Sequence, residues 1–453
     1  MYMIYLDFTQ MLFFILWGIV VIIFFLWFAY LYFKKEIITV LSSTVLMKIF
    51  IPLVLMYPFA FSKKNIVSTG VNAYNQYLSE INKVFIISLI GILFFSLGCY
   101  VASKTKINSK LFKELSNAYC YTFSNKKNLT LYFGCLVLIF LFMFKLGFFQ
   151  NYFGGRSFAM QNTSLRPISN FFYSAGTVFL MITLTRYYDE KSKLVLFYII
   201  FSLAMALTSG TRGAVLNSIM LFVFMYYNIN AKDPSRANIF KLFAGGLVLL
   251  TAAMYLGDAR QEQYNLFVAL VHAGDKILYG NNFSDLRDFA WVTAYWNNEL
   301  QYGKTIISGY LSFIPSSLFP LRSQWGLGIF TVTTIGYDTS IHPGLRPGIF
   351  GESYFNFGII GVCLSSFLYG LVVNIVSKHV QEIIYNSFSK KEIIYKVSLG
   401  YLISAAISNF MITAGFFNVY VLVIIIFVGI LKYMWRRKFN YKSKLRKKYR
   451  IIW

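Results

Sequence analysis

Long apolar runs recur along this chain, and they limit its fold more than any other feature. The first run, residues 11–33, carries no charge, and further runs follow at intervals as far as residue 434. A helix of about 20 apolar residues matches the hydrocarbon thickness of a bilayer, and a helix satisfies its own backbone hydrogen bonds in lipid. The chain is 57% hydrophobic and only 13% charged, which is too apolar for an ordinary soluble domain. We therefore expect an all-α polytopic membrane protein.

The runs and their connectors predict about eleven transmembrane helices. Eight fall within residues 1–256 and three within residues 353–434; a long polar interval, 257–352, separates them, and a basic tail, 435–453, follows. The first run is too long for a signal-peptide core and has no cleavage site, so we expect it to remain as a span. The predicted spans are about 11–33, 37–61, 84–102, 129–149, 168–185, 194–208, 214–229, 240–256, 353–376, 393–413 and 416–434.

Positive charge gathers on one side of the predicted membrane. The net charge is +25, and most of the 42 Lys and Arg lie in the connectors after odd-numbered spans and in the tail. The positive-inside rule therefore places the N-terminus outside, the tail in the cytoplasm, and the interval 257–352 at the periplasmic or exterior face. This distribution indicates orientation and contact with membrane lipids, and it argues against a nucleic-acid partner. The four cysteines show neither a disulfide framework nor metal-ligand spacing.

The interval 257–352 holds two of the three histidines and eight of the seventeen acids, so we expect the chemistry to lie there. Within it, Asp285 and Asp288 flank Arg287. Their spacing does not put all three on one helix face, so a simple intrahelical salt bridge is not implied. The segment is either ordinary loop surface or part of a site. Two carboxylates three residues apart also suit a divalent cation, but no other ligands are evident, and we expect no metal.

Arginines near the predicted outer face are candidates for binding an anion. Arg212 lies in a Ser-Gly-Thr-Arg-Gly turn, residues 209–213, between two predicted spans. The free N–H groups of the following helix point at this turn and favour an anion. Arg212 therefore either binds phosphate or extends to lipid headgroups. The other candidates are Arg156, Arg260, Arg287 and Arg346.

A Gly/Pro-rich segment, residues 342–352, leads into the ninth span and carries two candidates for proton transfer. His342 is its only histidine, and neutral imidazole accepts a proton near neutral pH. Glu352 is expected at the start of the span, where an acid is costly unless it is paired, so we expect a partner such as an arginine. Glu352 is either a second candidate base or a cap for the helix N-terminus. His272, in apolar surroundings, fits a structural role.

Taken together, these features resemble the Wzy-type polysaccharide repeat-unit polymerases, also called O-antigen polymerases. The span count and the placement of the long loop fit this family, although Arg322 stands where the family usually carries Lys. Three segments carry the resemblance: Ser209 to Gly213; Phe313-Ile314-Pro315 with Leu318-Phe319-Pro320; and Gly344-Leu345-Arg346-Pro347 leading into residues 351–361.

The resemblance implies a glycosyltransferase class C-like membrane enzyme that uses no metal or other cofactor. Its substrates would be undecaprenyl-diphosphate-linked oligosaccharides, and a chain-length regulator is a further expected partner. The growing glycan would move from its carrier to a sugar hydroxyl of a new repeat unit. On this basis Arg212, Arg287 and Arg346 would bind the diphosphate, with Arg260 and Arg156 next. His342 is the first choice for the base and Glu352 the second.

Two other functions suit the same substrate. One is a ligase that moves the finished glycan to another acceptor, and the other is a flippase for the lipid-linked sugar. A flippase is expected to show repeat symmetry and charged residues along its spans. Here no internal repeat is visible and charge within the spans is sparse, namely Lys48 and Lys145. The pattern favours an enzyme of the bacterial inner (plasma) membrane with an outward-facing active site.

Overall fold

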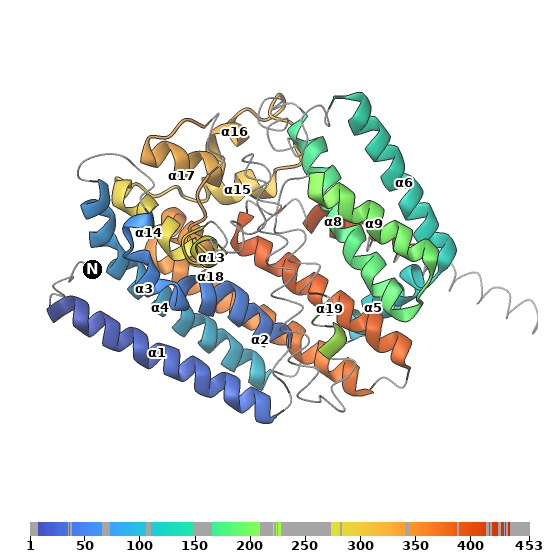
Figure 1. Ribbon diagram of the computed structural model, residues 1–453, viewed down its shortest axis with the longest axis horizontal. Helices are drawn as coiled ribbons and strands as arrows, with labels where there is room; N and C mark the ends of the chain where they lie inside the picture. Colours follow the sequence, from blue (N-terminus) through green and yellow to red (C-terminus); the bar gives the residue numbers. More distant parts are fainter. Residues whose placement is uncertain are drawn as a thin grey trace, which may run out of the picture.

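The structure is a computed structural model of the chain (Figure 1). Within the residues that it describes, all regular structure is helical and there is no β-strand. The predicted all-α class is confirmed for this part of the chain. The described residues are 8–34, 36, 39–65, 73–105, 110–147, 165–208, 221, 223, 225–227, 273–280, 283–339, 344–386, 389–413, 416, 419–424, 427–429, 431 and 434.

Helices long and apolar enough to cross a bilayer appear where the sequence predicts spans. In the described part of the chain there are five: α1 (Phe8–Phe33), α4 (Ala73–Lys104), α6 (Lys126–Lys145), α18 (Gly348–Asn386) and α19 (Lys390–Met411). Two further helices, α8 (Arg166–Asp189) and α9 (Lys193–Thr208), lie at the predicted fifth and sixth spans. The spans predicted at 214–229 and 240–256 fall almost entirely outside the described residues, so the count of eleven stays a prediction.

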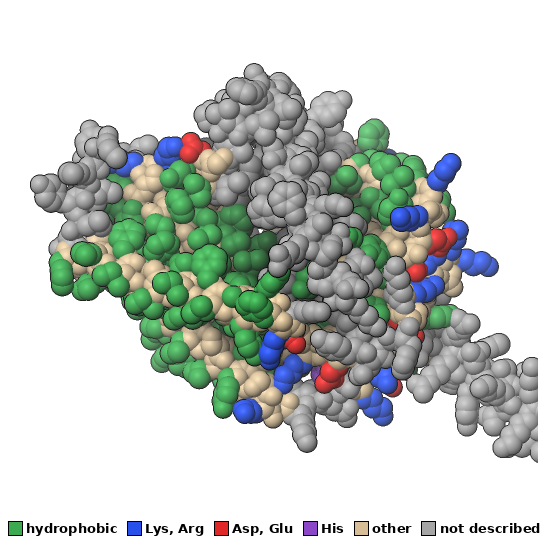
Figure 2. Space-filling view, turned by 60° about the horizontal axis from the view of Figure 1, so that its bottom comes forward, with side chains coloured by type: hydrophobic (Ala, Val, Ile, Leu, Met, Phe, Trp, Pro, Cys, Tyr) green, Lys and Arg blue, Asp and Glu red, His purple; other side chains and the backbone are tan. Residues whose placement is uncertain are grey.

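The helix α1 lies along one edge of the molecule (Figure 1), and many of its apolar side chains are exposed. Leu12, Ile22 and Leu26 are all exposed. Figure 2 shows a broad hydrophobic surface on one face of the molecule. A surface of this kind is unfavourable in water, but it is at no disadvantage against lipid chains. The exposed apolar surface therefore agrees with the multi-pass membrane protein that the sequence predicts.

The helices α4 and α18 form the central pair, and glycines allow their backbones to approach closely. A side chain at Gly98 of α4 would collide with the carbonyl oxygen of Phe367 in α18. The reverse contact occurs at Gly370 of α18, which lies against the carbonyl of Phe95. Small residues at helix crossings maximise van der Waals contact where lipid removes the hydrophobic driving force.

Polar side chains of α18 also cap the end of α4. The Nδ2 atom of Asn374 donates to the carbonyl of Cys99 at 2.6 Å. The Nζ atom of Lys378 donates to the carbonyls of Ala102 and Ser103 at 3.1 and 2.7 Å. The last carbonyls of a helix have no partner within it, so the bonds to Ala102 and Ser103 stabilise the C-terminus of α4. The α4 and α18 helices are thus joined by close glycine contacts along their length and by side-chain hydrogen bonds near the C-terminus of α4.

The second predicted span is interrupted rather than continuous. It consists of α2 (Val40–Thr44), a π-helix η1 (Val45–Leu55) and a short α3 (Tyr57–Ala60), with a 3-10 turn η2 (Lys63–Asn65) after them. Pro52 lies inside η1. Proline lacks the N–H that an α-helix needs, and wider π turns accommodate such a disruption. Lys48 also lies in η1 and is partly buried.

The long helix α18 carries a sharp kink at Gly358, whose φ is +63°. Such a backbone interrupts the helical hydrogen-bond ladder, and glycine adopts it without a Cβ penalty. Two backbone amides of the interval 257–352 donate hydrogen bonds to carbonyls just before the kink. The amide of Gln301 donates to the carbonyl of Phe355 at 2.9 Å, and that of Tyr302 donates to the carbonyl of Asn356 at 3.1 Å. The kink therefore ties the interval to the spanning helix.

A second group of helices contains α5 (Lys110–Phe123), α6, α8 and α9, and α19 packs against α5 and α8. Arg186 of α8 is buried between these helices. Its Nη1 atom donates to the carbonyl of Ser124 at 2.8 Å, to Asp189 at 3.1 Å and to the hydroxyl of Tyr395 at 3.3 Å. One guanidinium thus links α8, α19 and the turn between α5 and α6.

The described residues of the interval 257–352 form short helices that pack onto the spans. Trp291 of α14 is fully buried and stacks on Tyr77 of α4, with ring centroids 4.4 Å apart. The doubly prolyl stretch Phe313–Pro320 forms turns rather than a straight helix. The α15, α16 and α17 helices gather on one side of the molecule (Figure 1). The helices are α13 (Ala273–Leu278), α14 (Asp285–Tyr295), α15 (Lys304–Tyr310), α16 (Leu321–Trp325) and α17 (Leu327–Ile335).

Candidate functional site where α14 meets α18

The charged segment 285–288 forms the first turn of α14. Ser284 occupies the N-cap position, and Asp285 and Asp288 lie in the first turn. Acids are favoured there because the helix N-terminus carries partial positive charge. The hydroxyl of Ser284 donates to Oδ2 of Asp288 at 2.8 Å. The local sequence therefore both starts the helix and fixes one carboxylate.

Arg287 and Asp288 form an ion pair although they are neighbours in the chain. Nε and Nη2 of Arg287 donate to Oδ1 of Asp288 at 3.0 and 2.8 Å. Nη1 of Arg287 donates to the carbonyl of Tyr279 at 2.7 Å. Arg287 is only 9% exposed, and Asp288 is buried as well. A paired and hydrogen-bonded charge is tolerated at such depth.

Asp288 also positions the turn that precedes α18. Its Oδ2 atom accepts a hydrogen bond from the backbone amide of Arg346 at 3.1 Å. The neighbouring amide, that of Leu345, donates to Oγ1 of Thr331 in α17 at 3.0 Å. The side chains of Asp288 in α14 and Thr331 in α17 thus fix the backbone at Leu345 and Arg346. The side chain of Arg346 itself is exposed.

Asp285 lies where α14, η1 and the start of α18 come together. A Cβ at Gly348, whose φ is +72°, would lie 3.1 Å from Cβ of Asp285 and 3.3 Å from Cδ2 of Leu53 in η1. Burial raises the pKa of Asp285 to about 6, and the positive charges of Lys48 and Arg346 oppose that rise. The carboxyl therefore interacts electrostatically with one cation from a spanning segment and with one from the turn.

Glu352 lies in α18, just over one turn from its start, and is 1% exposed. Its Oε1 atom accepts from the hydroxyls of Thr305 and Thr413 at 2.9 and 2.6 Å, and its Oε2 atom accepts from the amide of Thr413 at 2.8 Å. Asn356, one turn later, donates to Oγ1 of Thr305 at 2.7 Å. The expectation that this acid needs a partner is met by threonines; among the described residues no arginine pairs with it. Glu352 thus joins α15, α18 and the end of α19.

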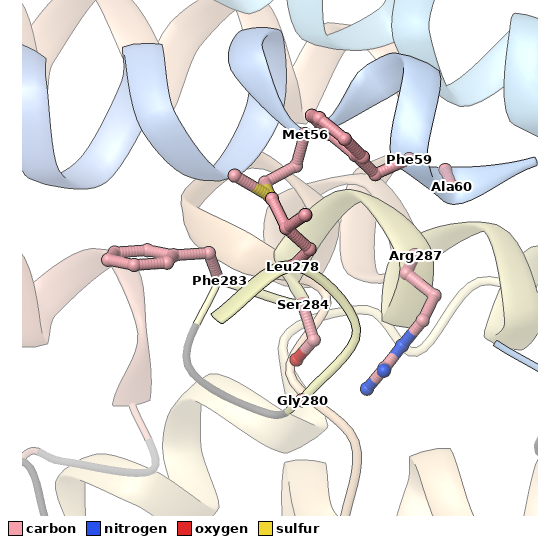
Figure 3. Close-up of a pocket in the computed structure, with 8 residues that line it drawn as sticks. All are labelled: Met56, Phe59, Ala60, Leu278, Gly280, Phe283, Ser284 and Arg287. Atoms are coloured by element: carbon pink, nitrogen blue, oxygen red, sulfur yellow. The ribbon is translucent and has the colours of Figure 1, made fainter. Parts of the chain in front are cut away.

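A small pocket lies beside the Arg287–Asp288 ion pair, between α3 and the turn from α13 to α14 (Figure 3). Its volume is about 10 Å³, which is room for about one water molecule and not for a sugar. Arg287 and Ser284 line its polar side. The pocket therefore belongs to the packing around the ion pair.

The structure brings together some of the predicted site residues. Arg287 and the turn that carries Arg346 meet at Asp288, and Glu352 follows in α18, the helix that begins directly after that turn. Within the part of the chain that the structure describes, no cluster of three or more His, Cys, Asp or Glu could hold a metal ion. The remaining candidates lie outside the described residues: Arg156, Arg212, Arg260 and His342.

Sequence reasoning missed the residues that hold the candidates in place. Asp288 is the carboxylate on which Arg287 and the 344–347 turn converge, and Ser284 before two acids was a readable signal for a helix start. Lys48 was visible as a charge in an apolar run, but nothing in the sequence connects it with Asp285. Thr305 and Thr413 carry no signal, because their roles arise only when distant segments meet.

The fold and site define a polytopic helical membrane protein with buried charges where a spanning helix begins. A family model described as O-antigen polysaccharide polymerase Wzy matches residues 1–281. That is more than half of the 453 residues, so the chain belongs to the Wzy family of O-antigen polysaccharide polymerases. Members are membrane glycosyltransferase-type polymerases that act on lipid-linked oligosaccharide repeat units. No curated protein and no solved structure matches the chain significantly.

The family match confirms the resemblance drawn from the sequence. It includes the Ser209–Gly213 segment and three of the candidate arginines, namely Arg156, Arg212 and Arg260. It ends before Arg287 and before the 342–352 segment. The roles of the residues after position 281 therefore depend on the geometry described above.

Proposed function

We propose that this protein polymerises O-antigen or capsule-type repeat units that are carried on undecaprenyl diphosphate. The acceptor is a repeat unit on its own carrier, and one of its sugar hydroxyls attacks the anomeric carbon of the donor glycan. A new glycosidic C–O bond forms, and the bond from the anomeric carbon to the diphosphate oxygen breaks. The hydroxyl proton passes to a base, and undecaprenyl diphosphate leaves with the bonding electron pair.

The observation that carries this proposal is the fixed position of Arg346. Its backbone is held by Asp288, its side chain is exposed, and the spanning helix α18 begins two residues later. A cation at the mouth of a spanning helix suits a lipid diphosphate, on which negative charge develops as the glycan departs. Arg212, Arg260 and Arg156 complete the proposed diphosphate site. Arg287 contributes by fixing Asp288.

We assign proton acceptance to His342. Neutral imidazole is suited to this step near neutral pH. Both carboxylate oxygens of Glu352 already accept hydrogen bonds from threonines. Its geometry therefore supports a positioning role, in which it holds α15 and the residues just after α19 against α18.

The predicted orientation places the reaction at the outer face of the bacterial inner membrane. The proposed reaction needs no metal ion, because the arginines supply the positive charge. It also allows a length-regulating partner in the same membrane. Sustained activity in excess EDTA would support the metal-free mechanism, whereas an EDTA-sensitive activity that Mg²⁺ restores would contradict it.

Deletion of the gene in its own host tests the function. The surface glycan is separated by size and compared with that of the parent strain. Loss of long chains with retention of single capped repeat units supports a polymerase. Loss of all surface glycan would contradict the proposal and indicate a flippase or a ligase.

A further inference from the structure

Lys48 is a charged residue within the second span for which the proposed reaction has no role so far. It lies in η1 and is partly buried. A charged side chain within a membrane span is costly, and such residues mark substrate or ion sites more often than lipid-facing surface. The charged groups around Lys48 therefore indicate the function of its positive charge.

Three segments converge next to Lys48. The π-helix η1 packs against both α14 and α18. At the convergence, Gly348 lies against Leu53 of η1 and Asp285 of α14. Lys48 precedes Leu53 by five residues, which is the spacing that a π-helical hydrogen bond closes, so the two lie on the same side of η1.

The charges at this convergence do not balance. Lys48 interacts electrostatically with Asp285 and with Arg346. Within the described part of the chain, no carboxylate lies within 4.0 Å of Nζ of Lys48 or of the guanidinium of Arg346. Asp288 pairs with Arg287. Among the residues that the structure describes, one carboxylate therefore interacts with two cations, and this group of three carries an excess of positive charge that an anion would neutralise.

None of the three side chains is fully enclosed. Arg346 is exposed, and Lys48 and Asp285 are only partly buried. The first N–H groups of α18, which starts at Gly348, add partial positive charge at the same place. A diphosphate that is joined to a lipid tail reaches a cation within a span more readily than a free phosphate does, because its tail stays in the bilayer.

We infer that Lys48 binds the substrate diphosphate together with Arg346, and that Asp285 is the counter-ion that the two cations share. This inference rests on the proposed function and adds a residue from the second span to the site. It also extends the site from the turn at α18 into the membrane-spanning part of the protein.

The test uses the full-length protein, purified in detergent, and undecaprenyl diphosphate as the probe. Undecaprenol, which has the same tail and no phosphate, is the matched control ligand. We expect Lys48→Met to weaken undecaprenyl diphosphate binding roughly tenfold, which is the loss of one charge-assisted contact. Lys48→Arg should bind within about threefold of the wild type, because it keeps the charge. Lys145→Met, which removes an exposed lysine at the end of α6, should leave binding unchanged.

A second variant makes the test independent of whether Lys48→Met folds. Asp285→Asn removes the carboxylate that competes with the ligand, so it should tighten undecaprenyl diphosphate binding and leave undecaprenol binding alone. Weaker diphosphate binding by Asp285→Asn would overturn the inference. So would wild-type affinity in Lys48→Met, or equal losses in Lys48→Met and Lys48→Arg.

The two proposals fail in different ways. Normal undecaprenyl diphosphate binding by Lys48→Met would exclude Lys48 from the site. It would not contradict the polymerase function, because that function is tested separately in the deletion strain. A wild-type protein that does not prefer undecaprenyl diphosphate to undecaprenol overturns the inference directly. A deletion strain with normal long-chain glycan overturns the function, whatever the binding results.

Discussion

At the scale of single residues, Asp288 does most to organise the site. Oδ1 accepts from two nitrogens of Arg287, and Oδ2 accepts from the hydroxyl of Ser284 and the amide of Arg346. Each oxygen is therefore used twice. The carboxylate both neutralises a buried cation and anchors the turn that presents Arg346, so it couples the stability of α14 to the geometry of the site.

Asp288→Asn should destabilise the protein by about 3 kcal/mol, because it leaves the Arg287 charge buried and uncompensated. It also replaces one acceptor oxygen with a donor. Ser284→Ala is the control, since it removes a single neutral donor and should cost about 1 kcal/mol. Thermal unfolding of both variants in one detergent compares them. An unfolding midpoint of Asp288→Asn equal to that of the wild type would show that the pair is not needed for stability.

Asp285 gives the site a predicted pH dependence. Burial raises the pKa of its carboxyl from 3.8 to about 6. The folded protein therefore holds this proton more tightly than the unfolded chain, and this group's contribution to stability falls as pH rises from about 4 to about 6. Asp285→Asn mimics the protonated acid and should remove that fall. We expect the unfolding midpoint of the variant to rise relative to that of the wild type as pH rises from about 4 to about 6, and to stay higher above pH 6. A difference between the two midpoints that does not change with pH would contradict the assignment.

At the scale of helices and turns, the central pair of helices sets the geometry. The α4 and α18 helices approach through Gly98 and Gly370, and α18 then presents its N-terminal end to α14 and η1. A small change in the crossing of these two helices would move Gly348 relative to Asp285. The position of the charged site therefore depends on glycine contacts elsewhere along the same helix.

Gly98→Ala tests this dependence against a matched glycine. Its new methyl group would meet the backbone of Phe367, so we expect a loss of about 1–3 kcal/mol from overpacking. Gly134→Ala, in α6, meets no atom within 4 Å and should be neutral or stabilising by up to about 1 kcal/mol, because alanine favours helix. Unfolding with increasing SDS in mixed micelles measures both. Equal stability of the two variants would show that the α4–α18 contact is not tight.

The apolar spans were predictable because their signal is local. Residues 11–33, 84–102 and 353–376 each lie inside an observed helix, since hydropathy over about 20 residues decides a span without help from its neighbours. The break in the second span was foreshadowed only by Pro52. The start of α18 was predicted at 353 rather than 348 because glycines at 348 and 351, which suggested a turn, are accommodated in its first turn.

The candidate site was predictable only in its residue types. Arginines and a glutamate near a span end are visible in the sequence, and Arg287, Arg346 and Glu352 were singled out for that reason. Their partners were not visible, because the Arg346–Asp288 and Glu352–Thr413 contacts join positions 58 and 61 residues apart. Tertiary packing decides which charges pair and which are left for a ligand.

At the scale of the whole molecule, the site is shared between the membrane helices and the interval 257–352. The spans contribute η1 with Lys48 and the start of α18, and the interval contributes α14 and the turn with Arg346. Neither part holds the complete set of charges. The interval alone should therefore be inactive. We also propose that Arg212, from the segment between the predicted sixth and seventh spans, binds the diphosphate.

The central claim is that arginines at the membrane face bind the diphosphate during polymerisation. The most direct test is the glycan chain-length ladder of the deletion strain complemented with wild type, Arg212→Ala, Arg287→Ala or Arg346→Ala, each checked for its level in the membrane. We expect Arg212→Ala and Arg346→Ala to lower long-chain product on the order of a hundredfold, the typical effect of removing one group that stabilises developing charge, while single capped units persist. Lys145→Ala should leave the ladder unchanged. Normal ladders from all three arginine variants would contradict the claim.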